Sequence, residues 1–259
     1  MIGPHVSLIK GDINSLNQYY KYFDCAQIFL GSPKTLKVPE YSLYTPPFNK
    51  VLVVHASFCV NLIKDDVEYY AKALSYLAKL SFQSNKVGAR YIVTHVGAIS
   101  PNQTKSAQEV LYNFCMDWLE ATNNHKTILC LECDAGSKKG TKKGSLSLLF
   151  NFVSRLNHPR IRICFDTEHA YANGFNLDSN KIDYLLESQF VSVVHLNSIP
   201  NEVELGSHLD RHTSTRITEG KEQDRIKYIY EKAKLLSIPC ILERDINLVK
   251  DDIKYLEGN

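Results

Sequence analysis

The chain has 259 residues, of which 44% are hydrophobic and 22% are charged, a balance that excludes a disordered or low-complexity chain. The formal net charge is only +2, so overall charge neither indicates nor excludes a nucleic-acid partner, and a binding surface for one requires local clustering. No stretch resembles a membrane span or a cleavable leader, so we expect an intracellular protein without a membrane partner.

Short apolar runs rich in Val, Ile, Leu and Cys recur along the chain and predict eight strands. Near-continuous apolar runs are typical of strands buried on both faces, as in parallel sheets. In chain order the predicted strands are Ile2–Ser7, Ala26–Leu30, Val51–Ala56, Tyr91–Gly97, Thr127–Cys133, Ile161–Thr167, Val191–Asn197 and Cys240–Arg244.

The segments between these strands mostly carry apolar residues at helical spacing. Four prolines crowd the link between the second and third strands, which leaves room for a short helix at most. Alternating strands and helices predict an α/β fold, a closed (β/α)8 TIM barrel that forms a single domain over residues 1–259. The alternative, an open doubly wound sheet, usually has a glycine-rich phosphate loop after its first strand, and none is present. The predicted helices are Asp66–Leu80, Gln103–Leu119, Ser145–Leu156, Lys181–Leu186 and Arg225–Leu236.

The seven cysteines lie mostly inside apolar runs. Their odd number predicts reduced, buried thiols in a reducing compartment. Cys130 and Cys133 form a CxxC pair, but no second pair accompanies them and the segment reads as a strand. We therefore do not expect a redox site or a zinc ribbon.

Polar side chains stand at the carboxyl ends of seven predicted strands. Within several strands, alternation places the terminal side chain on the same face as the apolar residues two and four positions before it. In a barrel that face is the interior, and the strand ends form the mouth where active sites occur. One such histidine is usually structural and one such carboxylate is often a helix cap, but seven at one end are not coincidence. The residues are His5, His55, His95, Glu132, Asp166, His195 and Glu243.

Buried carboxylates and imidazoles crowded together are costly unless a cation compensates them. Histidine and carboxylate ligands suit zinc, manganese or iron. Two further segments supply the same ligand types, Asp166-Thr-Glu-His169 and Asp210-Arg-His212. The sequence therefore predicts a metal site at the carboxyl-terminal mouth of the barrel, with Glu168 as a solvated or supporting carboxylate.

Several of these segments resemble motifs of one known family. Gly3-Pro-His5-Val-Ser7 resembles GAHVS, and the segment His55 to Leu62 resembles a histidine segment that ends in INL. Phe165 to Gly174 resembles the DTCHAFAAG signature, and His195-Leu-Asn197 with Gly206 to His212 resembles HLND and GSxxDRH. With Ile241-Leu-Glu243 matching a terminal ILE, the chain resembles the endonuclease IV family of apurinic/apyrimidinic endonucleases over its whole length.

The resemblance implies a trinuclear zinc centre, with Mn2+ or Fe as alternatives at part of it. One zinc would be held by His55 and His95, with Glu132 bridging to a second zinc completed by Asp166, His195 and Glu243. His169, Asp210 and His212 would hold the third. The implied reaction is hydrolysis of the phosphodiester 5′ to an abasic site in double-stranded DNA, which leaves a 3′-hydroxyl and a 5′-deoxyribose phosphate. Glu132 and Glu243 would be the catalytic residues, with Glu243 orienting the nucleophile.

The candidate DNA contacts follow from position. Arg211, between two predicted ligands, is a candidate phosphate contact, and His5 is a candidate DNA contact at the mouth. Phe58, three residues after His55, either stacks on the gap in abasic DNA or packs in the core under the next loop. The lysines after the fifth predicted strand either clamp phosphates or form a solvated loop. They are Lys138, Lys139, Lys142 and Lys143.

Two other functions remain open. One is a metal-dependent sugar isomerase or epimerase on a related barrel, which usually holds one or two metals and leaves the Asp210-Arg-His212 segment unexplained. The other is a non-catalytic barrel that binds nucleic acid, which the complete ligand set disfavours. The expected partner is damaged double-stranded DNA, and we expect a monomer in the cytoplasm or wherever that DNA is.

Overall fold

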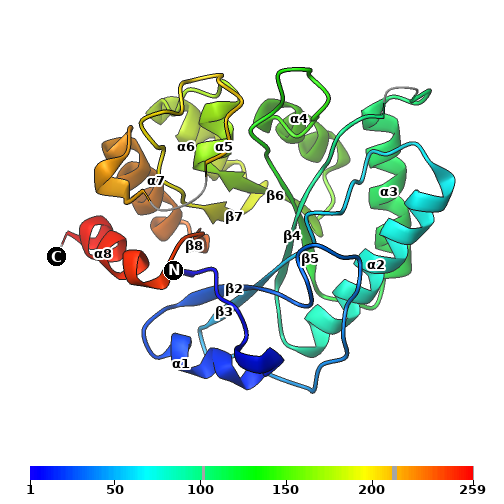
Figure 1. Cartoon of the computed structure of the whole chain (residues 1–259), viewed down its shortest axis with the longest axis horizontal. Coiled ribbons are helices and arrows are strands. Elements are labelled where there is room, and N and C mark those ends of the chain that lie inside the picture. Colours follow the sequence, from blue (N-terminus) through cyan, green and yellow to red (C-terminus); the bar gives the residue numbers. More distant parts are fainter. Residues whose placement is uncertain (101–102, 212–214, 259) are drawn as a thin grey trace.

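The computed structural model describes residues 1–100, 103–211 and 215–258. Over these residues, eight strands form one parallel sheet that curls into a nearly closed barrel, and helices surround it (Figure 1). All eight predicted strands are confirmed, although most are a residue or more shorter than predicted. They are β1 Ile2–Pro4, β2 Cys25–Phe29, β3 Val51–His55, β4 Tyr91–His95, β5 Ile128–Glu132, β6 Ile161–Asp166, β7 Val191–His195 and β8 Cys240–Leu242.

The five predicted helices are also present, with shifted ends. Helices α1, α5 and α8 and the short 3-10 turns were not predicted, and α1 and α5 are too short for a clear helical repeat. Residues 31–50, between β2 and β3, contain no helix, as the prolines predicted. The helices are α1 Asn17–Tyr20, α2 Val67–Lys86, α3 Ala107–Ala121, α4 Leu146–Leu156, α5 Thr167–Ala172, α6 Ser179–Glu187, α7 Gln223–Leu235 and α8 Ile246–Glu257, with 3-10 turns at Ile9–Gly11, Ile13–Leu16 and Ile217–Glu219.

Side-chain caps fix where several helices begin. The Asp66 carboxylate accepts a hydrogen bond from the Tyr69 backbone N–H at 2.7 Å and starts α2, and the Ser106 hydroxyl accepts from the Glu109 N–H at 3.1 Å and starts α3. Each cap satisfies one of the backbone donors that the first turn leaves unpaired. None of the described helices is long and apolar enough to cross a membrane.

The barrel closes at the seam between β1 and β2. β1 pairs with β8 along its length, whereas its parallel pairing with β2 is reduced to one isolated bridge between His5, which directly follows β1, and Gln27. Beside this bridge, Val6 N–H donates to Gln27 O at 2.8 Å. The two strands come so close that a Cβ on Gly3 would lie 1.7 Å from the Cys25 carbonyl oxygen. Only glycine allows this approach, so Gly3 permits the closure.

The barrel interior and the layer outside it are two separate cores. Inside are side chains such as Val53, Val93, Cys130 and Val193, and the larger outer core packs the strands against the helices. This confirms the alternation predicted for β3, β4 and β5, whereas in β7 Val193 faces inward as predicted but Val191 packs in the outer core. Cys130 points inward while Cys133 belongs to the outer core, so the two thiols of the CxxC pair face opposite sides of the barrel wall. The expectation of buried thiols is wrong for one residue, because Cys59 is exposed on the loop after β3.

Candidate metal centre

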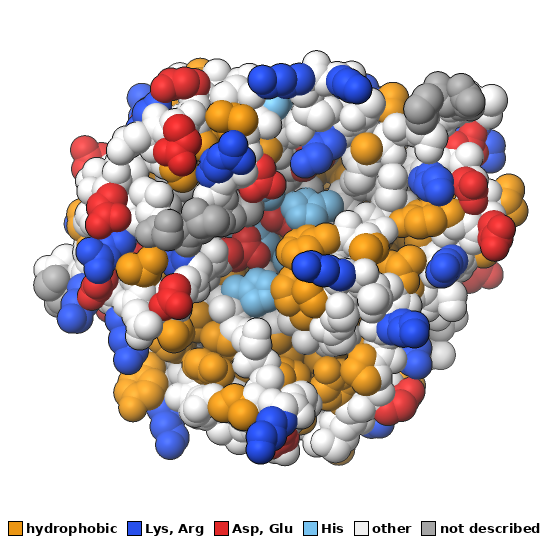
Figure 2. Space-filling model, viewed as in Figure 1, with side chains coloured by type: hydrophobic (Ala, Val, Ile, Leu, Met, Phe, Trp, Pro, Cys, Tyr) orange, Lys and Arg blue, Asp and Glu red, His pale blue; other side chains and the backbone are white. Residues whose placement is uncertain are grey.

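A cavity of about 940 Å³ opens at the carboxyl ends of the strands. Figure 2 shows imidazole and carboxylate side chains gathered in a hollow at the centre of this face. Its lining includes His5, His55, His95, Glu132 and Glu243. A cavity of this size with converging titratable groups has the form of a ligand site.

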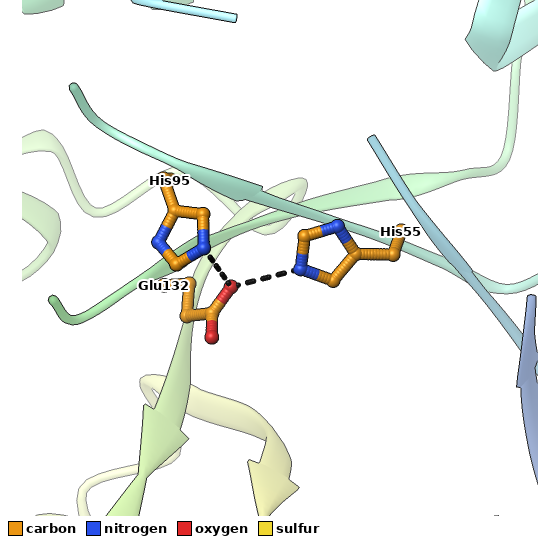
Figure 3. A group of neighbouring side chains, drawn as sticks. All are labelled: His55, His95 and Glu132. Atoms are coloured by element: carbon orange, nitrogen blue, oxygen red, sulfur yellow. Dashed lines mark hydrogen bonds and ion pairs between the residues drawn. The ribbon is translucent and has the colours of Figure 1, made fainter. Parts of the chain in front are cut away.

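The first group of potential ligands joins β3, β4 and β5. His55 Nε2 lies 3.1 Å and His95 Nε2 lies 3.4 Å from the same oxygen of Glu132, Oε2 (Figure 3). His55 Nδ1 donates to the Ala56 carbonyl at 2.7 Å. That bond puts the proton of neutral His55 on Nδ1 and leaves Nε2 with a lone pair directed at the group, as in metal-binding histidines.

The second group uses the other oxygen of Glu132. Glu132 Oε1 lies 3.0 Å from His195 Nδ1, which is also 3.2 Å from Glu243 Oε2 and 3.7 Å from Asp166 Oδ2. The potential ligand atoms of these four residues all lie within 4.8 Å of one another. Glu132 is 1% exposed and presents one oxygen to each group, the arrangement of a bridging carboxylate.

Asp166 is both a helix cap and a potential metal ligand. Its Oδ1 accepts from the His169 backbone N–H at 2.8 Å and so caps α5. Its Oδ2 faces the second group and accepts from Asn197 Nδ2 at 2.7 Å. The cap holds the carboxylate in one orientation, which directs the second oxygen toward the cluster.

A third pair of potential ligands lies beside the first two groups. His169 Nε2 is 3.4 Å from Asp210 Oδ2, and His169 Nδ1 donates to the Cys133 carbonyl at 3.0 Å. The buried Glu168 carboxylate accepts from the Arg211 backbone N–H at 2.7 Å, which ties the segment after β7 to α5. The prediction that Glu168 is a solvated carboxylate is therefore wrong, while a supporting role fits. His212, the predicted third ligand here, lies outside the described residues.

The electrostatics of the cluster favour a cation. Burial alone would raise the pKa of Glu132, but His95 and His195 hold this pKa well below 4.5. Burial alone would lower the pKa of His169, but Asp166, Asp210 and Glu132 hold it well above 6.5. In the metal-free protein, protons on imidazoles therefore compensate the buried carboxylates, and a divalent cation can take their place.

The donor chemistry fits zinc or a similar first-row metal, because the clustered ligands are imidazoles and carboxylates. A nearby thiol does not change this conclusion. Burial raises the pKa of the Cys164 thiol, which lies inside the barrel, to about 12, so it stays protonated at neutral pH. His95 is uncharged at neutral pH, because burial lowers its pKa to about 4, so one of its ring nitrogens already has a lone pair to offer.

Two polar residues that were not predicted belong to the cluster. Gln27, fully buried on β2, lies between His5, His195 and Glu243. Asn197, 2% exposed just after β7, donates to Asp166 and lies 3.2 Å from Glu243 Oε2. A glutamine in the middle of an apolar strand, in step with inward residues, was the signal that could have identified Gln27.

The predicted DNA contacts lie at different depths. His5 stands next to Glu243, with Nδ1 3.3 Å from Oε1. Phe58 is 59% exposed and lines the cavity, its ring 5.4 Å from that of His55, so the core placement is wrong and the mouth placement is confirmed. Arg211 is exposed beside Asp210. The loop after β5 carries the four lysines, and among them Lys142 lines the cavity.

Known proteins with similar sequences and folds place this chain in a family. A family model for xylose isomerase-like TIM barrels matches residues 47–256, so the barrel and its cluster define a protein of that class. A protein of Mycoplasmopsis synoviae named "Probable endonuclease 4" is 30% identical over 267 residues, covering 93% of this chain and 91% of the relative. The chain belongs to the endonuclease IV family.

Solved structures agree on the fold. The crystal structure of endonuclease IV from Thermus thermophilus superposes with a TM-score of 0.78 at 23% identity, covering 99% of this chain and 97% of that one. A D-tagatose 3-epimerase-like protein superposes with a TM-score of 0.71 at 17% identity, covering 99% and 96%. At these identities the likeness concerns the barrel alone, and function has to be argued from the site.

Proposed function

We propose that the protein is an endonuclease that hydrolyses the phosphodiester 5′ to abasic sites in double-stranded DNA, using three zinc ions. The observation that carries this proposal is the sharing of Glu132 between two ligand groups, with the His169–Asp210 pair beside them. Family membership supports a nuclease. The lesion, the cleavage position and the number and identity of the metals belong to the proposal.

The proposed ligands form three sets. His55, His95 and Glu132 would hold the first ion, and Glu132, Asp166, His195 and Glu243 the second. His169 and Asp210, with His212, would hold the third. When bound, such ions lower the pKa of water and neutralise charge on the attacking and leaving oxygens of a phosphodiester.

Glu243 is the residue best placed to act on the nucleophile. It lines the cavity, and its side chain is 14% exposed, so a water molecule in the cavity can reach it. Neighbouring His195 and His5 hold the pKa of Glu243 well below 4.5 although burial alone would raise it, so the carboxylate is charged at neutral pH. It would orient the attacking water by accepting a hydrogen bond from it.

The rim supplies contacts for the damaged strand. An abasic nucleotide has already lost its base pair, so moving it into a cavity costs less than for an intact nucleotide. The exposed ring of Phe58 would cover the exposed sugar or neighbouring base, and the Lys142 ammonium, with Arg211, would bind flanking phosphates.

The rival function is a sugar isomerase or epimerase, because a D-tagatose 3-epimerase-like protein has the same fold. Such enzymes need one or two metals, and the two groups that share Glu132 already supply those. The His169–Asp210 pair at 3.4 Å then has no role, whereas a third ion in the nuclease gives it one. A non-catalytic DNA-binding barrel leaves the whole buried cluster without a purpose.

Incision of a duplex oligonucleotide that contains one abasic analogue tests the proposal, with the undamaged duplex as control. The zinc-loaded protein should cut only the damaged duplex and leave a 3′-hydroxyl, and elemental analysis should find close to three metals per chain. One metal or none in active enzyme would contradict the trinuclear centre. Absence of incision by the metal-loaded protein would refute the nuclease.

Glu243→Gln tests the assigned role of the carboxylate. Incision should fall by about 100-fold or more while binding to abasic DNA, measured by fluorescence anisotropy, is largely kept. Glu231→Gln, an exposed change on α7, is the matched control and should leave both unchanged. A fully active Glu243→Gln enzyme would rule out the role.

A further inference from the structure

Gln27 is a neutral residue in the middle of the charged cluster. Its side chain is fully buried inside the barrel on β2, and its amide lies within hydrogen-bond distance of three potentially functional side chains. Nε2 is 2.8 Å from Glu243 Oε1 and 3.0 Å from His5 Nδ1, while Oε1 is 2.9 Å from His195 Nε2. No other strand of the described barrel places an amide among these residues.

The chemistry of these partners fixes the orientation of the amide. A carboxylate oxygen only accepts hydrogen bonds, so the group facing Glu243 has to be the NH2 of Gln27. The amide oxygen then faces His195 and only accepts. His195 Nε2 therefore carries a proton and donates it to Gln27 Oε1 at 2.9 Å.

This assignment decides which nitrogen of His195 is available. With the proton of the neutral ring on Nε2, the lone pair is on Nδ1, the atom that lies 3.0 Å from Glu132 Oε1 and 3.2 Å from Glu243 Oε2. Gln27 also engages Oε1 of Glu243 and leaves Oε2 turned toward His195 and Asn197. One amide thus orients two of the four side chains in the second ligand group.

We propose that Gln27 is a positioning residue that prepares His195 and Glu243 for the second metal of the cluster, holding His195 Nδ1 and Glu243 Oε2 as the ligand atoms. The inference rests on the metal centre of the proposed function and deepens it. Outer groups that orient metal ligands are typically worth about 10–100-fold in metal affinity.

The backbone of β2 keeps this amide in place. Gln27 forms the bridge with His5 that closes the barrel, and its carbonyl accepts from Val6 N–H at 2.8 Å. Because Gly3 lets β1 approach β2 this closely, the seam brings the amide between the ends of β1, β7 and β8. The same contact between β1 and β2 therefore closes the barrel and places the Gln27 amide against His195 and Glu243.

Two substitutions separate the two halves of the role. Gln27→Leu removes both the acceptor for His195 and the donor for Glu243. Gln27→Glu keeps an acceptor for His195 but places a carboxylate against Glu243. Gln83→Leu is the matched control, because Gln83 is equally buried and hydrogen-bonded but lies on α2, where it contacts Glu40 and the Tyr41 backbone.

The measurements are metal affinity by chelator competition with Zn2+, the absorption spectrum of the Co2+-loaded protein, and the tautomer of His195 in the Zn2+-loaded protein by histidine 15N NMR. We expect Gln27→Leu to lose about 10–100-fold in affinity for one of the bound ions. Its Co2+ spectrum should change, and its His195 should lose the single tautomer protonated on Nε2. Gln27→Glu should keep that tautomer and still lose affinity.

Gln83→Leu should retain the wild-type affinity, spectrum and tautomer even if its melting temperature falls. Wild-type metal affinity and Co2+ spectrum in both Gln27 variants would overturn the inference. If Gln27→Leu does not fold, Gln27→Glu and the tautomer of His195 in the Zn2+-loaded wild-type protein decide, and a His195 that is protonated on Nδ1 with metal bound would overturn the inference.

The two proposals can fail separately. Wild-type protein that binds metal but does not cut abasic DNA would refute the nuclease and leave the Gln27 measurements valid. Wild-type protein that cuts, together with Gln27 variants that bind metal normally, would refute only the positioning role. A wild-type protein that binds no divalent metal would overturn both.

Discussion

A buried ion pair beside the metal cluster gives the sharpest stability prediction. Arg244, which directly follows Glu243, donates through Nη1 to Asp252 Oδ2 of α8 at 2.8 Å, and their side chains are 3% and 1% exposed. Asp252 Oδ1 accepts from the Ile217 N–H at 2.9 Å, and Arg244 also donates to the Thr215 carbonyl at 2.9 Å. The pair therefore joins the end of β8, helix α8 and the segment that precedes α7.

The magnitude follows from desolvation. Burial raises the pKa of Asp252 and lowers the pKa of Arg244, each against the attraction of the other, so removing the charges from water costs more than their attraction returns. Asp252→Asn keeps an oxygen for Ile217 N–H but leaves the Arg244 charge buried without its counterion. Breaking one side of such a pair costs about 3–5 kcal/mol of the free energy of unfolding. For a chain of this size that corresponds to a fall in melting temperature of about 6–20 °C.

The neighbouring residue supplies the control. Asp251 Oδ2 lies 3.2 Å from Arg216 Nη2, but these side chains are 49% and 41% exposed. Asp251→Asn should therefore cost no more than about 1 kcal/mol. Thermal unfolding of both variants, in the metal-free and the metal-loaded protein, measures the difference. Equal losses of stability, or a loss below about 1 kcal/mol for Asp252→Asn, would refute the argument from burial.

Three other predictions concern the mouth and the cluster. Phe58→Ala should keep the wild-type melting temperature, because Phe58 is 59% exposed, and should lose about 1–3 kcal/mol of binding free energy for an abasic duplex. A loss of about 3–5 kcal/mol in the free energy of unfolding, as for a core residue, together with normal incision kinetics would contradict the stacking role. Replacing the four lysines at 138, 139, 142 and 143 by Ser should reduce the slope of log DNA affinity against log salt concentration by about one unit for each phosphate that is no longer bound. Lys142, which lines the cavity, should account for the largest share. An unchanged slope would favour a solvated loop. In the metal-free protein, the raised pKa of His169 contributes stability that is fully present below about pH 6.5 and is lost as pH rises through that raised pKa. The lowered pKa of Glu132 contributes stability that is fully present above about pH 4.5 and is lost as pH falls through that lowered pKa. The melting temperature of chelator-treated protein should therefore fall above about pH 6.5, and a rise there would contradict the assignment.

Much of the site could be predicted from the sequence because its information is local. Apolar runs with a period of two identify the strands and the side that faces inward, and the residue type at each strand end is read directly. His55, His95, Glu132 and His195 were placed on one face in this way, and the structure brings them together. The link of residues 31–50 without a helix followed from its prolines in the same manner.

Other features depend on atoms that are far apart in the chain. Glu132 presents one oxygen to each ligand group only because β4, β5 and β7 meet at one end of the barrel, and no spacing in the sequence indicates this. The mouth position of Phe58 and the exposure of Cys59 depend on the path of the loop after β3.

The strands, their inward faces and the residue types at their ends could therefore be predicted from the sequence, because backbone periodicity acts over a few residues. Which of those side chains touch, and which nitrogen of a histidine carries its proton, follows only from the folded barrel. Gln27 shows the difference most clearly, since it stands mid-strand and is uncharged. Its importance arises from three hydrogen-bond distances, each about 3 Å or less, to residues that are 22, 168 and 216 positions away, because closing a barrel brings the first strands beside the last.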